Sequence, residues 1–348
     1  MKNSKSTDSQ LSAITEVVKV REALFYEEYD ENSVICKLCP HNCVISNSKT
    51  GLCKVRMNKK GVLYSMNYGE ISSISMDPIE KKPLFHFYPG TDILSIGSWG
   101  CNFKCPFCQN WQISQEEPGV QRIDPVRLVS IALEHNSKGI AYTYNEPMVW
   151  FEFVLDSSRL ATKEGIYNVL VTNGFIEIEP LKLLLQSVQA MNIDLKGFNE
   201  EFYRKVCKGE LKSVMKVIEK SVEHGVHVEI TTLIIPDEND NIKELREEFK
   251  WLSSLNPDIP LHISRYFPNY KYSAPPTPVE KLVEAYENAR EFLNFVYIGN
   301  LWDKRYESTY CPDCGELVIE REGYSIKFTG LDEEGKCRKC GRDIVKNF

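Results

Sequence analysis

Apolar and polar positions follow two different periods along most of the chain, and the change of period predicts its elements. From residue 93 onward, short apolar runs typical of buried strands alternate with longer stretches of helical periodicity. The predicted strands cover residues 93–97, 140–144, 168–172, 191–195, 226–233, 261–266 and 296–298. Strands that alternate with helices indicate βα units and a parallel sheet. Because six or seven units fall short of the eight in a closed barrel, we expect an α/β fold with an open, partial βα barrel.

Capping residues mark several predicted helix ends. Asp124 and Pro125 supply an N-cap and a first-turn proline before an apolar stripe. Residues 277–280 read Thr-Pro-Val-Glu, which predicts a capping box at the start of another helix. Gly165 and Gly225 lie where the residue after a helix C-cap belongs.

The same patterns divide the chain into four parts. An amphipathic helix is predicted over residues 11–26 and short strands over residues 61–75. We therefore expect an N-terminal helix or extension over residues 1–30, a cysteine-rich module over 31–75, the partial barrel over 76–305 and a separate C-terminal module over 306–348.

Composition narrows the class of protein. No apolar run approaches the length of a membrane span, and the N-terminus lacks the apolar core of a signal peptide, so we expect a cytoplasmic protein. The net charge of −7 disfavours a nucleic-acid surface. Twelve cysteines in a reducing compartment indicate metal sites. Cys207 alone stands apart from the cysteine clusters, and we interpret it as a small buried residue.

Two clusters each offer four thiols. The C-terminal one has paired C-x2-C knuckles around a predicted β-hairpin, which is typical of a zinc ribbon; its ligands would be Cys311, Cys314, Cys337 and Cys340. The N-terminal one suits either zinc or a second iron–sulfur cluster, with Cys36, Cys39, Cys43 and Cys53 as ligands.

The third cluster follows the first strand of the predicted barrel. Cys101, Cys105 and Cys108 form a C-x3-C-x2-C pattern, and three thiolates so close in sequence can converge on one metal centre. A complete [4Fe–4S] site takes four thiolates and a closed zinc site four ligands. Three cysteines therefore leave one iron open, unless they form a zinc knuckle that borrows a fourth ligand.

This pattern, with Phe107 before its third cysteine, resembles the signature of the radical S-adenosylmethionine (SAM) superfamily. The sequences of residues 77–83 and 108–111 resemble those of one branch of this superfamily, the AmmeMemoRadiSam-system enzymes. This branch is related to the pyruvate formate-lyase activating enzymes. The resemblance covers nearly the whole chain after about residue 25. It implies a (β/α)6-type partial barrel, a [4Fe–4S] cluster on the three cysteines, and SAM as the ligand of the open iron.

Polar residues follow the predicted strands at the carboxyl ends, where βα barrels place their active sites. They are Asn145, Glu146, Asn173, Asp194, Lys196, Ser264 and Arg265. The carboxylate of Glu146 and the amide of Asn145 suit the ammonium group of SAM, and a lysine suits its carboxylate. The resemblance implies that Asp194 and Lys196 contact SAM and that Phe107 lies near its adenine. Val171 and Phe267 depart from the pattern of the family.

The resemblance implies an oxidoreductase that cleaves SAM reductively to a 5′-deoxyadenosyl radical, which abstracts hydrogen from a substrate. Kinship to activases favours a protein glycine as that substrate. The partners would be a flavodoxin or ferredoxin as electron donor, and AMMECR1- or MEMO-like proteins. The alternatives are RNA or nucleotide modification, with the ribbon docking the nucleic acid, and an iron–sulfur electron carrier that does not cleave SAM. The sequence predicts no catalytic side chain beyond cluster and SAM.

Overall fold

A computed structural model describes residues 21–346 and residue 348. Its central sheet has the order β16-β15-β14-β13-β12-β11-β9-β8. The strands are β8 (Ser73–Pro78), β9 (Asp92–Gly97), β11 (Gly139–Tyr142), β12 (Tyr167–Thr172), β13 (Ala190–Asp194), β14 (His227–Ile234), β15 (Leu261–Arg265) and β16 (Val296–Gly299). All neighbours pair in parallel except β8, which runs antiparallel to β9. The predicted strands and the parallel sheet are confirmed, whereas the partial barrel stays a prediction.

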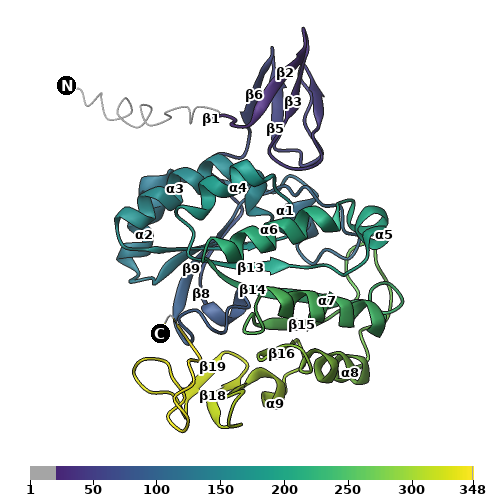
Figure 1. Cartoon of the computed structure of the whole chain (residues 1–348). Helices are drawn as coiled ribbons and strands as arrows, with labels where there is room; N and C mark the ends of the chain where they lie inside the picture. Colours follow the sequence, from purple (N-terminus) through teal and green to yellow (C-terminus); the bar gives the residue numbers. More distant parts are fainter. Residues whose placement is uncertain (1–20, 347) are drawn as a thin grey trace, which may run out of the picture.

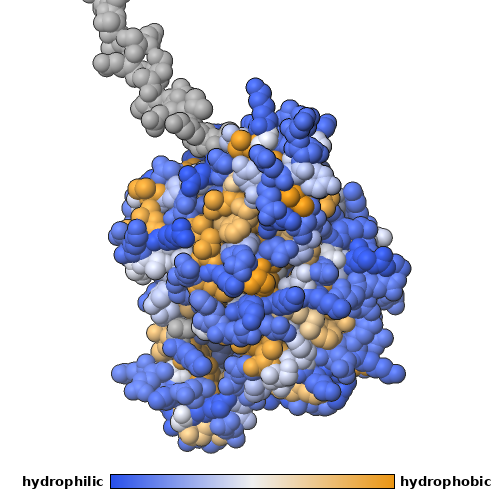
Figure 2. All heavy atoms as spheres, turned by 45° about the horizontal axis from the view of Figure 1, so that its top comes forward, coloured by the Kyte–Doolittle hydropathy of each residue, from blue (hydrophilic) through white to orange (hydrophobic). Residues whose placement is uncertain are grey.

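Helices connect the parallel strands and pack against the sheet and each other (Figure 1). The longer ones are α2 (Pro125–Glu134), α3 (Phe151–Lys163), α4 (Ile178–Leu185), α6 (Leu211–Glu223), α7 (Ile242–Leu255) and α8 (Val279–Ala289). The short ones are η1 (Ile79–Lys81), α1 (Trp111–Ser114), η2 (Pro147–Trp150), α5 (Glu200–Phe202), η3 (Tyr203–Cys207) and α9 (Lys304–Glu307). Among the described residues, none of these helices combines the length and apolar character that a bilayer span requires. The face in Figure 2 is mostly hydrophilic, with apolar side chains in limited patches.

The helix ends confirm three of the four predicted signals. Asp124 caps α2 by accepting a hydrogen bond from the Arg127 amide at 2.8 Å. Gly165 and Gly225 follow the C-caps of α3 and α6 with φ of +74° and +83°, in the left-handed region that favours glycine.

The predicted capping box over residues 277–280 is wrong. Helix α8 begins at Val279, and its N-cap is Pro278, which makes no side-chain cap bond. The buried Thr277 hydroxyl instead donates to the Ile234 carbonyl at 2.6 Å and accepts from the Tyr266 amide at 3.0 Å. The hydroxyl is therefore used to join the ends of β14 and β15.

The N-terminal part forms two small sheets beside the central one, at the top of Figure 1. Their strands are β1 (Arg21–Glu22), β2 (Tyr26–Asp30), β3 (Ser33–Cys36), β4 (Val44–Ser46), β5 (Arg56–Lys59) and β6 (Val62–Ser65). The predicted helix over 11–26 falls mostly outside the described residues, and its described end is wrong, because residues 21–26 hold β1 and the first residue of β2. The strands expected over 61–75 are confirmed as β6, β7 (Glu70–Ile71) and the start of β8; β7 pairs with β10 (Gln121–Arg122).

A buried ion pair joins this N-terminal part to helix α3. The Arg56 guanidinium lies 3.0 Å from the Glu152 carboxylate, and both side chains are almost fully buried. Glu152 also accepts from the Leu24 amide at 2.8 Å, and Arg56 donates to the Leu24 carbonyl. Each charge thus has several partners, as a buried pair requires.

The C-terminal part is a small sheet packed on the edge of the central one. It contains β17 (Thr309–Tyr310), β18 (Leu317–Glu322) and β19 (Ser325–Phe328), and the hairpin turns at Gly323 with φ of +59°. Its apolar side chains share a cluster with Phe295 and Tyr297 around β16. The predicted hairpin is confirmed, and its apolar side chains pack with those of β16, the last strand in the order of the central sheet.

Replacing Glu152 with Gln is predicted to lower the free energy of unfolding by about 3–5 kcal/mol, because the Arg56 charge stays buried without its counter-ion. Urea unfolding followed by circular dichroism measures the change. Glu134→Gln is the matched control: Glu134 pairs with Arg127 at the surface, so its loss should cost less than about 1 kcal/mol. Equal losses in the two variants would contradict the buried pair's role.

Candidate active site

A cavity of about 500 Å³ lies at the carboxyl ends of the central strands. That volume is within the range of about 300–1,000 Å³ typical of small-molecule sites. The predicted residues that line it are Cys101, Cys105, Phe107, Cys108, Asn145, Glu146, Asn173, Asp194, Lys196 and Ser264. Arg265 does not line it, because its Nε donates to the Thr277 carbonyl at 2.8 Å and its guanidinium lies over the Phe267 ring. Of the two divergent positions, Val171 lines the cavity and Phe267 does not.

The cysteine loop begins where β9 ends and is held by tight backbone contacts. Gly100 has φ of +88°, and a Cβ there would lie 2.7 Å from the Cys53 carbonyl oxygen, so only glycine fits. The Asn145 side chain accepts from the Ser98 amide at 2.9 Å and donates to the Gly100 carbonyl at 3.0 Å. Asn145 therefore supports the loop that carries the first cysteine, a role that its sequence position did not reveal.

The three loop thiols fit an open iron–sulfur site better than zinc. Zn–S bonds of about 2.3 Å place tetrahedral sulfurs about 3.8 Å apart. Among the described residues, three or more potential ligand atoms come within 4.8 Å of one another only in the C-terminal cysteine cluster. The cavity lining holds no further cysteine and no histidine, so no fourth thiol or imidazole completes the set there. Three thiols with an open position match a cluster that binds an external ligand.

Burial and neighbouring groups keep the loop thiols protonated in the protein alone. Burial raises the pKa of the Cys101 thiol well above its usual value. A hydrogen bond with Cys207, together with burial, does the same for the pKa of Cys105. A metal that binds these thiols would therefore have to displace their protons. Cys207 is fully buried, as predicted, but its contact with Cys105 was not foreseen.

Glu146 is a buried carboxylate at the cavity wall. It accepts hydrogen bonds from the Met148 amide at 2.9 Å, the Thr172 hydroxyl at 2.6 Å and the Asn173 amide at 2.8 Å. Burial nevertheless raises its pKa to about 7. A cation in the cavity would favour the ionised form. The carboxylate thus suits an ammonium group of a ligand.

Asp194, Lys196 and Asn173 stand across the same cavity. The Lys196 ammonium lies 2.9 Å from the Asp194 carboxylate, and although burial lowers the pKa of Lys196, that carboxylate raises it above its usual range. The Asn173 amide donates to Asn102 Oδ1 at 2.9 Å and lies 3.7 Å from the Cys101 sulfur. Phe107 is buried, with its ring stacked on Phe202. These four residues therefore line one cavity, as the sequence predicted.

The floor of the cavity comes from a segment that the strand-end rule did not identify. Residues 79–91, here called the strap, connect β8 to β9. Lys82 is buried, lines the cavity and pairs with Asp77 at 2.7 Å, while Tyr144 also donates to Asp77. Despite burial, hydrogen bonds from Lys81, Lys82 and Tyr144 hold the pKa of Asp77 well below its usual range. The only feature of the sequence that pointed to this segment was the resemblance of residues 77–83 to the family.

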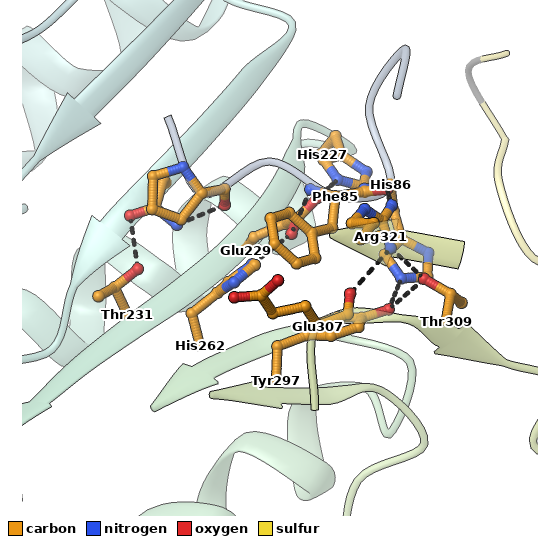
Figure 3. A network of polar contacts seen from close by, with 12 residues as sticks. Phe85, His86, His227, Glu229, Thr231, His262, Tyr297, Glu307, Thr309 and Arg321 are labelled. Atoms are coloured by element: carbon orange, nitrogen blue, oxygen red, sulfur yellow. Dashed lines mark hydrogen bonds and ion pairs between the residues drawn. The ribbon is translucent and has the colours of Figure 1, made fainter. Parts of the chain in front are cut away.

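A buried carboxylate on β14 holds the strap against the central sheet (Figure 3). Glu229 accepts from the amides of Phe85 and His86 at 3.0 and 2.8 Å, and lies 2.9 and 2.7 Å from the Nε2 atoms of His227 and His262. Although its own burial opposes this, the two imidazoles hold the pKa of Glu229 well below its usual range.

The C-terminal module contacts the other side of the strap. Arg321 donates to the Phe85 carbonyl at 2.8 Å and to the Thr309 hydroxyl at 2.6 Å, as Figure 3 shows. His86 lies 2.6 Å from the Tyr297 hydroxyl, and burial lowers the pKa of His86 to about 4. The strap is thus fixed between β14 and the C-terminal module.

The C-terminal thiols have the spacing of a closed metal site. Cys311 and Cys340 have sulfurs 3.4 Å apart, and those of Cys314 and Cys337 are 3.6 Å apart. These distances are close to the tetrahedral edge of about 3.8 Å expected for zinc. Four convergent thiols are confirmed here, and the identity of the metal stays a prediction.

Comparisons with known proteins agree with the geometry. The model of the radical SAM superfamily matches residues 96–249. An uncharacterized protein of Methanocaldococcus jannaschii is 47% identical over 332 residues, covering 93% of this chain and 99% of the relative. The pyruvate formate-lyase 1-activating enzyme of Escherichia coli K12 is 25% identical over 158 residues, covering 42% of this chain and 64% of that enzyme.

A solved structure supports the fold alone. The crystal structure of Streptococcus suis SuiB bound to S-adenosylmethionine matches with a TM-score of 0.50 at 13% identity, covering 64% of this chain and 53% of that one. The superfamily match includes the cysteine loop and most of the strands around the cavity. From the sequence relatives and this match, the chain belongs to the radical SAM superfamily, and an activating enzyme is among its relatives.

Proposed function

We propose that the protein is a radical SAM enzyme whose [4Fe–4S] cluster is held by Cys101, Cys105 and Cys108. When bound, cluster and SAM supply the chemistry: one electron cleaves the carbon–sulfur bond and yields a 5′-deoxyadenosyl radical that takes hydrogen from the substrate. The observation that carries this proposal is the three-thiol loop in a cavity whose lining offers no other cysteine or histidine. A pure electron carrier would complete its ligand set.

The chain's own residues bind and orient the cofactor in this proposal. Glu146, held by three hydrogen bonds, accepts the ammonium group of SAM. Lys196 faces the carboxylate of SAM and exchanges part of its pairing with Asp194 for it. Phe107, buried at the cavity wall, contacts the adenine side. Asn145 holds the cysteine loop in place and Lys82 closes the floor.

The substrate proposal rests on the relatives. Similarity to a pyruvate formate-lyase activating enzyme supports hydrogen abstraction from a glycine of a partner protein, with a flavodoxin or ferredoxin as electron donor. The AmmeMemoRadiSam resemblance adds AMMECR1- and MEMO-like proteins as candidate partners. The C-terminal thiols would hold a structural zinc ion, because four thiols close the tetrahedron and leave no position for chemistry.

Replacing Cys105 with Ala is predicted to abolish SAM cleavage, because the cluster loses one of its three protein ligands. The measurement is 5′-deoxyadenosine formed after anaerobic reconstitution with iron, sulfide, dithionite and SAM. Glu134→Gln, at the exposed surface of α2 and away from both cysteine sites, is the control and should retain turnover. Wild-type protein that loads iron at this loop but yields no 5′-deoxyadenosine would contradict the proposed function.

Replacing Glu146 with Gln is predicted to weaken SAM binding and to remove its pH dependence. Because the wild-type pKa is raised to about 7, the carboxylate ionises as pH rises through 7. Wild-type affinity should therefore increase about five-fold between pH 6 and pH 7, whereas the variant stays flat. Calorimetric titration of the reconstituted protein with SAM measures both profiles. Parallel profiles in the two proteins would show that Glu146 does not face the ammonium group.

A further inference from the structure

We propose that Cys36, Cys39, Cys43 and Cys53, here called the N-terminal quartet, hold a second iron–sulfur cluster that passes electrons to the catalytic cysteine loop. The cluster assignment stands on the quartet's own geometry. The electron route rests in addition on the function proposed above.

The quartet gathers four thiols from three adjacent segments. Cys36 ends β3 and donates its backbone amide to the Cys43 carbonyl at 3.0 Å. A Cβ on Gly51 would lie 3.6 Å from the Cys43 sulfur, which brings the loop of Cys53 next to Cys43. Cys39 lies in the turn between Cys36 and Cys43, where the Asn42 amide donates to the Cys39 carbonyl at 3.1 Å. The His41 Nε2 contacts the Asn102 carbonyl at 2.8 Å, so this nitrogen is engaged outside the quartet.

The spacing of the thiols separates this quartet from the C-terminal one. The C-terminal sulfurs approach to 3.4 and 3.6 Å, as a single zinc ion requires. In the part of the chain that the structure describes, no three thiols of the N-terminal quartet come within 4.8 Å of one another. The cysteines of a cubane bind different iron atoms at separate corners, so their sulfurs lie farther apart than those around one ion. The quartet shares this wider arrangement with the catalytic loop.

The quartet also lies directly against the catalytic loop. The Cys53 carbonyl oxygen lies so close to Gly100 that a Cβ there would come within 2.7 Å of it, and Gly100 precedes Cys101. Lys54, the residue after Cys53, donates to the Gln115 carbonyl at 2.6 Å. The His41 contact with Asn102 fixes the other end of the quartet to the residue after Cys101. The close approach of Cys53 to Gly100 and the side-chain contact of His41 with Asn102 thus join the two cysteine sets on both sides of Cys101.

This arrangement defines an electron route. A low-potential one-electron carrier protein reduces the quartet's cluster by one electron and is itself oxidised by one electron. That electron moves to the cluster of the catalytic loop, so the quartet's cluster returns to its oxidised state. One carrier is consumed for each SAM cleaved, and no proton or bond changes at the quartet. Cys39 and Cys43 are partly exposed, whereas Cys53 is buried beside the catalytic loop.

Metal content tests the cluster assignment. After anaerobic reconstitution, wild-type protein should hold about eight iron atoms per chain, and both Cys105→Ala and Cys39→Ser should hold about four. The reduced Cys105→Ala protein should give an electron paramagnetic resonance signal that SAM does not change, and Cys39→Ser one that SAM does change. A Cys105→Ala protein with no iron and a second zinc ion would overturn the assignment. Cys43→Ser repeats the test if Cys39→Ser does not fold, as judged by circular dichroism.

Stopped-flow reduction tests the route. Reduced flavodoxin should reduce the catalytic cluster of Cys39→Ser at least ten-fold more slowly than that of wild type, while dithionite should reduce both at equal rates. Equal rates with flavodoxin would overturn the route. Failure of the proposed function has a different signature: no 5′-deoxyadenosine from wild type, while Cys105→Ala still binds iron.

Discussion

The site depends on how the backbone of the cysteine loop is held. Gly97 and Gly100 leave no room for a side chain, since a Cβ at either would come within 3 Å of a carbonyl oxygen. In that loop, the Asn145 side chain accepts a hydrogen bond from the Ser98 amide and donates one to the Gly100 carbonyl. Because β9 and β11 are paired neighbours, their ends bring the loop and Asn145 together without any flexible connection. A metal cluster with only three protein ligands needs this rigid support, because an open position gives it one anchor fewer than a closed site.

Buried charges organise the interior below the cavity. Asp77, Glu152 and Glu229 are each buried, and each has at least two partners, which include backbone amides for Glu152 and Glu229 and two lysines for Asp77. Removing one partner from such an arrangement leaves an unpaired charge in a low dielectric, so these groups specify one packing of the strap and the N-terminal part. The catalytic cavity is therefore bounded by segments far apart in sequence.

The sequence predicted what local pattern determines. The strands follow from apolar runs, and three helix ends follow from Asp124, Gly165 and Gly225. The polar residues that the strand-end rule selected all line the cavity except Arg265. The sequence-based prediction failed where a side chain forms a tertiary contact in place of the local one that was expected. Thr277 is drawn to Ile234 and Tyr266, and Arg265 to the Thr277 carbonyl, by contacts that no local window contains. Lys82 was missed because its place in the cavity depends on its pairing with Asp77 and on the packing of the strap against the central sheet.

The strap couples the C-terminal module to the active site. Arg321 binds the Phe85 carbonyl, and three residues before Phe85 the chain provides Lys82 at the cavity floor. Any ion that binds the folded C-terminal thiols but not the unfolded chain stabilises the module by mass action. Through the contact between Arg321 and the strap, part of that binding free energy then stabilises the position of Lys82 in the cavity. Removal of such an ion is therefore expected to weaken the packing of Lys82 at the cavity while leaving Cys101, Cys105 and Cys108 in place.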